Sequence, residues 1–293
     1  MTNTIAIFGL LVVLMAIGMP VGVALGLTVL SFMFIFTDVP LESVALKMFT
    51  GIEKFEIMAI PFFILAGNFL THGGVARRMI NFATAMVGHL RGGLGMSAVL
   101  ACALFAAVSG SSPATVVAIG SILIPAMIKQ GYPVRFGAGV VASAGGLGIL
   151  IPPSIVMVMY SVTTNSSVGA LFMAGVIPGL LLAFMLGLTT WYVARKNNYP
   201  TLQKVSWGDR FKAFRKAFWG LMLIVVVMGG IYSGMFTPTE AAAMSAVYAF
   251  IIAVFVYKDL TFKQIPRVLL DSANMSAMLL FIIASAVLFS FIL

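Results

Sequence analysis

The sequence predicts an all-α integral membrane protein with an internal inverted repeat, one re-entrant hairpin and broken helices. Of its 293 residues, 61% are hydrophobic and 9% are charged, whereas about a quarter of the residues of a typical globular protein are charged. Many apolar runs approach or exceed the about 20 residues that a helix needs to cross the hydrocarbon. Two runs are interrupted by glycine, serine and proline, and such backbone is tolerated at membrane depth only where it is buried in protein or lines a cavity. These breaks indicate a buried site for an ion or a solute.

The formal net charge of +9 belongs to short loops between apolar runs, not to a nucleic-acid-binding face. Cytoplasmic loops of helical membrane proteins collect Lys and Arg, and residues 195–216 carry seven basic side chains and one acid. We therefore place this loop inside, which puts the acidic loop 38–56 and the amino terminus outside. The single cysteine, Cys102, has no disulfide partner in the chain and is expected to be a small buried hydrophobe.

Apolar runs of helical length follow one another along the chain. They lie at residues 4–18, 20–36, 57–71, 92–108, 113–128, 136–162, 168–194, 217–236, 239–257 and 275–293. The first run lacks a basic start, so we expect it to stay in the membrane rather than to be removed as a signal peptide. Residues 75–91 differ, because Arg77, Arg78 and His89 are mixed with apolar side chains in a pattern typical of an amphipathic surface helix. We expect an arm there and not a span.

Residues 92–130 are predicted to form a hairpin that enters the membrane and returns to the same side. No charged side chain lies between Gly92 and Ile128. The central break, Ser109-Gly110-Ser111-Ser112-Pro113, has nothing charged or bulky to hold it at a water interface. This composition favours a re-entrant hairpin over two full crossings. Both alternatives return the chain to the same side of the membrane, so the topology alone does not decide between them.

The first break offers oxygen ligands. A helix that ends near Val108 leaves its last carbonyls unpaired, and Ser109, Ser111 and Ser112 add hydroxyl oxygens. Pro113 fits the first turn of the next helix, where its missing N–H costs nothing. Oxygens at a helix carboxy-terminal end suit Na⁺. The alternative is a tight turn with Ser112 as the N-cap and no ligand.

Residues 133–166 are predicted to form a broken helix, interrupted at 145–154. The glycines of this stretch allow close backbone approach, and its two prolines prevent regular helical hydrogen bonding. Ser154 and the polar side chains of residues 163–166 are further sources of oxygen. A simple proline kink explains this break alone, but two neighbouring breaks favour a shared site.

The order of features in the first 70 residues returns from residue 217. Two apolar runs joined through Gly18-Met19-Pro20 correspond to two runs joined through residues 234–238, and Asp38 corresponds to Asp259. The topology gives the two copies opposite orientations, a common plan in secondary transporters. The second copy stops before its own arm and hairpin, so we expect a carboxy-terminally truncated chain.

Other polar residues have simpler explanations. Thr237 and Glu240 have the spacing of a capping box, which we favour over a proton-carrying role for Glu240. Asn68 and Asp271 lie near the ends of apolar runs, where hydration at the interface is expected. No acid or histidine lies beside the serines to act as a base, and no metal-ligand cluster or nucleotide fingerprint is present. We therefore expect no enzyme, no catalytic residue and no cofactor.

Five stretches resemble the large membrane subunit, of the DctM type, of tripartite ATP-independent periplasmic (TRAP) transporters. They are Ile60–Gly67, Ser109–Thr115, Ile151–Ser154, Ala174–Gly179 and Phe236–Ala242. The likeness covers the whole chain, although family members are longer and carry a second hairpin.

The resemblance implies a Na⁺-coupled elevator-type importer of organic acids, multi-pass in the bacterial inner membrane. A C4-dicarboxylate is the first expectation, and sialic or another sugar acid is next. A small DctQ-type membrane subunit and a periplasmic DctP-type binding protein are the implied partners, and no nucleic acid is expected. Alternatives are a non-transporting membrane scaffold or assembly subunit and an ion channel, although no continuous polar pore is visible.

Carried over by position, the resemblance also assigns residues and domains. The implied Na⁺ site comprises Ser109, Ser112 and the backbone around Gly145, Gly148 and Pro152. The implied hairpin tip or substrate contacts are Ser111, Pro113 and Ser154. The implied domains are scaffold helices (1–74), the arm (75–91), a transport domain (92–166), a helix with a basic loop (167–216) and the first helices of the second repeat (217–293).

Overall fold

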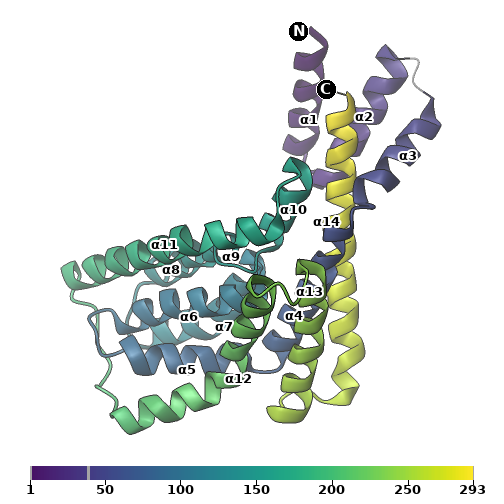
Figure 1. Cartoon of the computed structure of the whole chain (residues 1–293). Helices are drawn as coiled ribbons and strands as arrows, with labels where there is room; N and C mark the ends of the chain where they lie inside the picture. Colours follow the sequence, from purple (N-terminus) through teal and green to yellow (C-terminus); the bar gives the residue numbers. More distant parts are fainter. Residues whose placement is uncertain (1, 38–39, 293) are drawn as a thin grey trace. The chain divides into compact units, whose positions relative to one another are not determined.

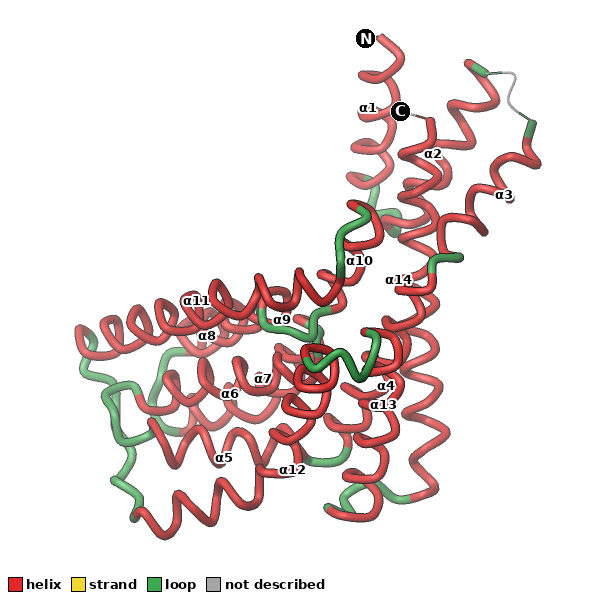
Figure 2. Tube along the Cα trace, viewed as in Figure 1, coloured by secondary structure: helices red, strands yellow, loops and turns green. Residues whose placement is uncertain are grey.

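The computed structural model describes residues 2–37 and 40–292, and all regular secondary structure in these ranges is helical (Figures 1 and 2). The chain forms two compact units, which are described separately. The first unit contains residues 1–57 and 273–293, and the second contains residues 58–272. The predicted all-α architecture is confirmed.

Six helical segments of the described chain are long and apolar enough to cross a membrane. They are Phe55–His72, Ser112–Lys129, Val168–Lys196, Trp207–Tyr232, Pro238–Val256 and Phe262–Ile292. A seventh span results if Val134–Leu150 and Ile155–Thr164, which meet at a bend of 44°, are counted together. This bent pair lies where the sequence predicts a broken helix, at 133–166. The structure thus has the helices expected of an integral membrane protein.

The first unit is a small helical cluster. Its helices are α1 (Thr2–Ala16), α2 (Val21–Phe36), α3 (Leu41–Ile52) and the part of α14 (Ile265–Ile292) that follows Ser272. Its core consists of apolar side chains from all four helices: Ile7, Val29, Met33, Val44, Leu288 and Phe289. Many of its other apolar side chains are exposed, as expected of helices that face lipid.

The second unit contains the remaining helices. In chain order they are η1 (Phe55–Met58, shared with the first unit), α4 (Ala59–His72), α5 (Val75–Val87), α6 (Gly93–Ser109), α7 (Ser112–Lys129), α8 (Val134–Gly145), α9 (Leu147–Leu150), α10 (Ile155–Thr164), α11 (Val168–Lys196), α12 (Trp207–Tyr232), α13 (Pro238–Ile251), the π-helix η2 (Ile252–Val256), η3 (Phe262–Gln264) and the start of α14. Helix α6 is central and contacts α5, α7, α8 and α11 (Figure 1). It is apolar around most of its circumference, as expected of a buried helix.

Helix α5 lies where the sequence predicts an amphipathic arm. It buries one face, which includes Val75, Met79 and Ile80, against α6 and α12, and it leaves Arg77 exposed. The amphipathic helix is confirmed, and it ends at Val87. Its orientation along the membrane surface stays a prediction.

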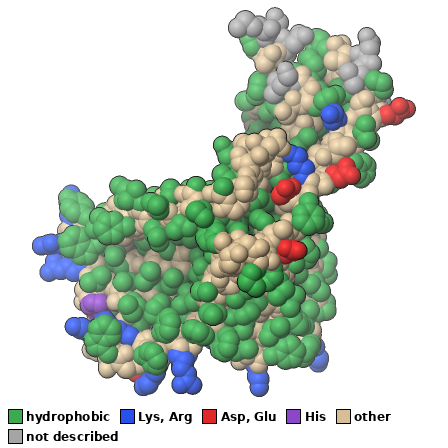
Figure 3. Space-filling model, viewed as in Figure 1, with side chains coloured by type: hydrophobic (Ala, Val, Ile, Leu, Met, Phe, Trp, Pro, Cys, Tyr) green, Lys and Arg blue, Asp and Glu red, His purple; other side chains and the backbone are tan. Residues whose placement is uncertain are grey.

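Several basic side chains of the second unit lie together near the end of α11, and others lie along its lower edge in Figure 3. Figure 3 shows Lys and Arg side chains gathered where α11 ends and the loop to α12 begins, while hydrophobic side chains cover most of the remaining visible face. This separation fits the inside placement of residues 195–216.

Of three polar predictions, two agree with the structure and one does not. Thr237 and Glu240 form the capping box at the start of α13: the Thr237 hydroxyl accepts from the Glu240 N–H, and the Glu240 carboxylate accepts from the Thr237 N–H. The expectation that Asn68 is hydrated at an interface is wrong. The residue is only 9% exposed, and its Nδ2 donates to Ser272 Oγ at 2.8 Å. Asp271, next in the chain to this partner, is exposed as expected.

Candidate functional site

The first break separates α6 from α7. Gly110 follows α6 with φ 62°, a left-handed conformation that favours glycine. Ser111 is extended, and its hydroxyl accepts from the Ala114 N–H at 3.5 Å. The alternative with Ser112 as the N-cap is therefore wrong by one residue: Ser111 is the cap, Ser112 is the first helical residue and Pro113 is the second. The predicted place of Pro113 in the first turn is confirmed.

A cluster of neutral oxygens lies at this break. Ser109 Oγ and Thr115 Oγ1 are 3.1 Å apart, and Thr115 Oγ1 donates to the Ser111 carbonyl at 2.8 Å. Ser109 and Thr115 are almost completely buried. Thr115 is not among the site residues predicted from the sequence, although its position one helical turn after Ser111 was a usable signal. Neutral hydroxyl and carbonyl oxygens of this kind suit an alkali cation.

The second break separates α8 and α9 from α10. The single turn α9 ends at Leu150, and the chain is then extended at Ile151 and again at Ser154. The Ser154 hydroxyl is completely buried and has no hydrogen-bond partner in the described chain. A buried polar group is normally paired, so this hydroxyl is available to bind a ligand or a water molecule.

The two breaks are in direct contact. The Ile155 N–H donates to the Gly110 carbonyl at 3.0 Å, and a Cβ on Gly110 would lie 2.7 Å from the Pro153 carbonyl oxygen. A Cβ on Gly148 would lie 2.8 Å from Ser112 N. The structure thus brings the two predicted sets of site residues together.

Gly145 also belongs to this contact, since a Cβ there would collide with Val116 Cγ2 and lie 3.7 Å from the Ser112 carbonyl oxygen. Pro152 is buried within the second break, while Ser111 and Ser112 are half-buried and Pro113 is exposed. Residues 163–166 are different. They lie at the far end of α10, about 15 Å along the helix from the break, and Thr163 and Thr164 donate to the Tyr160 carbonyl.

Two other helices enclose the breaks. On α4, a Cβ on Gly67 would lie 3.3 Å from the Ser109 carbonyl oxygen. On α11, a Cβ on Gly175 would lie 2.6 Å from the Leu150 carbonyl oxygen. Figure 2 shows the irregular chain between α9 and α10 next to α11. The breaks therefore lie against protein, which satisfies the rule for irregular backbone at membrane depth.

The site has no charged side chain of its own. Residues 92–128 and 136–194 contain no Asp, Glu, Lys, Arg or His. A cation bound here would be ligated by neutral oxygens and would keep its full charge. Such a buried charge is stabilised by an anion bound beside it.

The chain matches the family model described as "Tripartite ATP-independent periplasmic transporter, DctM component" over residues 8–293. It is 69% identical to the C4-dicarboxylate TRAP transporter large permease protein DctM of Rhodobacter capsulatus, over 99% of this chain and 69% of that protein. The identity to the corresponding protein of Pseudomonas aeruginosa is 54%, over 92% of this chain and 63% of that protein.

A relative with a different printed substrate is less similar. The sialic acid TRAP transporter large permease protein SiaM of Vibrio cholerae is 38% identical, over 98% of this chain and 67% of that protein. The chain thus spans about two thirds of the length of these relatives. All three are named as transporter permeases, which points to a role other than catalysis.

Proposed function

Because this chain belongs to the DctM component family of tripartite ATP-independent periplasmic transporters, we propose that it acts in the large permease subunit of a Na⁺-coupled importer of C4-dicarboxylates. The substrate assignment is supported by 69% identity to a C4-dicarboxylate permease, against 38% identity to a sialic acid permease. Sialic or another sugar acid is the next candidate. The named relatives and the apolar helices support placement in the bacterial inner membrane.

The observation that carries the Na⁺ proposal is the junction of the two breaks. Neutral oxygens lie within hydrogen-bonding distance of one another at the first break: the hydroxyls of Ser109 and Thr115 and the carbonyl of Ser111. At the second break, the buried Ser154 hydroxyl has no hydrogen-bond partner in the described chain. Helix α6 ends at this junction, and the negative end of its dipole stabilises a cation. The amino-terminal end of α7 stabilises an anionic group. Ser112, Gly145, Gly148 and Pro152 complete the proposed site.

The absence of charge in the site supplies a physical reason for coupling. A bound Na⁺ would be the only full charge among residues 92–128 and 136–194. A carboxylate brought beside it would stabilise the cation, and the cation would stabilise the carboxylate. By linkage, each ligand then raises the affinity for the other by the same factor.

In the proposed mechanism, residues 92–166 move as the transport domain and arm helix α5 connects them to the scaffold. A small DctQ-type subunit would extend the scaffold, and a periplasmic DctP-type protein would deliver the substrate. The close fit of Gly148 against Ser112 supports a role for the breaks in this movement. Because the two breaks touch, a shift of one break on binding would displace the other. The competing function is a membrane scaffold that only assembles with partners. It predicts that substitutions at Gly145 and Gly148 impair assembly alone.

The test is C4-dicarboxylate uptake into proteoliposomes that contain the complete transporter, measured against the Na⁺ concentration. Ser109→Ala and Ser112→Ala should raise the Na⁺ concentration required for half-maximal uptake by several-fold. Ser121→Ala is the matched control, since Ser121 is exposed on α7 and bonds only its own helix. Uptake that is independent of Na⁺, or an unchanged Na⁺ requirement in both variants, would contradict the proposed site.

A further inference from the structure

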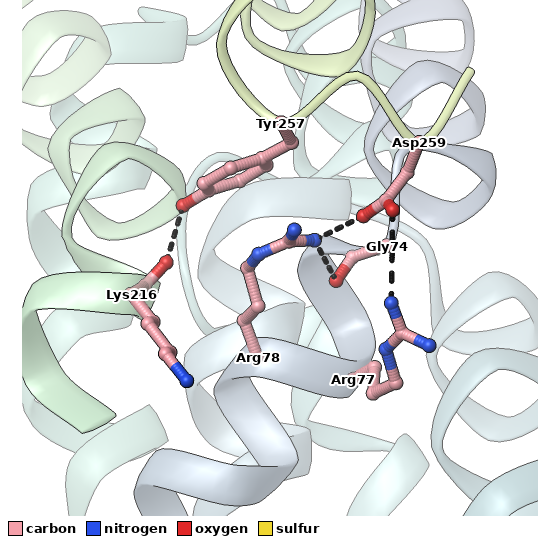
Figure 4. A network of polar contacts seen from close by, with 6 residues as sticks. All are labelled: Gly74, Arg77, Arg78, Lys216, Tyr257 and Asp259. Atoms are coloured by element: carbon pink, nitrogen blue, oxygen red, sulfur yellow. Dashed lines mark hydrogen bonds and ion pairs between the residues drawn. The ribbon is translucent and has the colours of Figure 1, made fainter. Parts of the chain in front are cut away.

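The beginning of arm helix α5 is bound to the connection between α13 and α14 by the carboxylate of Asp259 (Figure 4). Arg78 Nη1 donates to Asp259 Oδ2, and Arg77 Nη2 lies 3.7 Å from Asp259 Oδ1. Arg78 Nη1 also donates to the Gly74 carbonyl at 3.0 Å. One carboxylate thus meets two guanidinium groups from a single turn of α5.

The backbone at this point is shaped to admit the carboxylate. Gly74 precedes α5 with φ 68° and supplies no side-chain cap. A Cβ on Gly74 would collide with Asp259 Oδ2 and lie 2.8 Å from Arg78 Nη1. Asp259 therefore occupies the space at the amino-terminal end of α5, where the helix dipole stabilises a negative charge.

Tyr257 extends the contact to a third segment. The guanidinium carbon of Arg78 lies 3.8 Å from the centroid of the Tyr257 ring, and Tyr257 Oη donates to the Lys216 carbonyl on α12 at 2.7 Å. Burial raises the pKa of Tyr257 above its usual value, so it remains a neutral donor at physiological pH. The network therefore ties α5, α12 and the α13–α14 connection together.

The pair is partly shielded from solvent. The side chain of Arg78 is 19% exposed and that of Asp259 is 28% exposed, whereas the pair between Lys212 and Asp209 on α12 is 76% and 56% exposed. Exposed pairs contribute little to stability. Removal of one partner from a shielded pair leaves the other charge poorly compensated.

The contact with Asp259 lies at the opposite end of α5 from the connection to α6. Helix α5 has 13 residues and is therefore about 20 Å long. Its far end leads through residues 88–92 into α6, which ends at the first break. Helix α5 thus connects the Asp259 contact to the helix that ends at the candidate site.

We infer that Asp259 is a positioning residue for transport, which acts through Arg78 to fix one end of arm helix α5. This inference rests on the proposed function, in which the arm connects the moving residues 92–166 to the scaffold. The charge pair sets the orientation of α5, and neither of its side chains binds Na⁺ or substrate.

The test uses the complete transporter in proteoliposomes. Asp259→Asn and Arg78→Gln should each lower the maximal uptake rate by about tenfold, because the first leaves Arg78 without its carboxylate and the second leaves Asp259 with only the more exposed Arg77. The half-saturating concentrations of Na⁺ and C4-dicarboxylate should stay within about twofold, since neither group lies in the site. Asp259→Glu, and the exchange of Arg78→Asp with Asp259→Arg, should restore part of the rate. Asp209→Asn is the matched control and should leave the rate unchanged.

A second readout is independent of uptake. Spin labels on cysteines introduced at the exposed residues Asn81 and Lys263 report the distance between α5 and the segment after Asp259, while Cys102 is buried. Asp259→Asn should broaden this distance distribution and Asp209→Asn should not. A broadened distribution in a protein whose uptake is independent of Na⁺ would support the positioning role of Asp259 and contradict the proposed function. Three results would contradict the positioning role of Asp259: an unchanged distance distribution, an unchanged uptake rate, or a loss of rate that the charge exchange does not restore.

Discussion

The N–H of Ile155 donates a hydrogen bond of 3.0 Å to the carbonyl of Gly110, so the two helix breaks are joined backbone to backbone. Gly110 has a left-handed conformation, and its α-carbon faces the Pro153 carbonyl. Each break thus fixes the position of the other. The candidate site depends on how closely these two backbones approach.

Gly148→Ala should abolish most uptake. The added methyl group would lie 2.8 Å from Ser112 N and 2.9 Å from the Ser111 carbonyl carbon, which are backbone atoms that cannot rotate away. Gly139→Ala on the preceding helix α8 is the control, since no atom outside its own helix backbone lies within 4 Å of the new methyl group. Uptake and the amount of assembled complex are measured for both. Normal uptake by the Gly148 variant would show that the breaks do not have to touch.

Gly110→Ala tests the junction from the other side. A left-handed alanine costs about 1–2 kcal/mol, and the methyl group would also approach the Pro153 carbonyl oxygen to 2.7 Å. Gly131→Ala measures the cost of the left-handed conformation alone, because Gly131 has φ 85° and open space where the methyl group would be added. Thermal unfolding should show a clearly larger loss for the Gly110 variant. Equal losses would mean that the Pro153 carbonyl moves aside freely.

The pair of Asn68 and Ser272 should show energetic coupling. Asn68 Nδ2 donates to Ser272 Oγ, and Ser272 Oγ donates to the Val268 carbonyl. A double-mutant cycle with Asn68→Ala and Ser272→Ala, measured by unfolding in detergent, should give about 0.5–1.5 kcal/mol. Additive losses would show that the two side chains act independently.

Glu240 should act as a helix cap and not as a proton carrier. Glu240→Gln keeps an oxygen to accept from the Thr237 N–H and should retain uptake and thermal stability. Glu240→Ala removes that acceptor and should lower the unfolding temperature. If Glu240→Gln loses uptake while it stays folded, the carboxylate has a role in transport that the capping box does not explain.

The features that the sequence predicted well are those with a local cause. The breaks at 109–113 and 145–154 follow from glycine and proline, which act on the residues beside them. The capping box of Thr237 and Glu240 follows from spacing alone. The position of the cap at the first break was off by one residue, because proline is tolerated at either of the first two helical positions.

The features that were missed depend on residues far apart in the chain. The buried Asn68 is paired with Ser272, and no pattern near Asn68 indicates that partner. Arg78 looks like any charge on an amphipathic helix until Asp259 is brought against it by folding. Thr115 was overlooked because it lies within a regular helix, where a threonine usually bonds its own backbone, as this one also does.

A contact between main-chain atoms has no side chain that a mutation can delete. Replacing the Ile155 side chain with alanine will therefore not remove its bond to Gly110, and an ester in place of the Ile155 amide is the change that removes the donor. The same property separates the junction from the side chains around it: an exchange of the side chain at 111, 112 or 154 leaves both atoms of the bond between Ile155 and Gly110 in place.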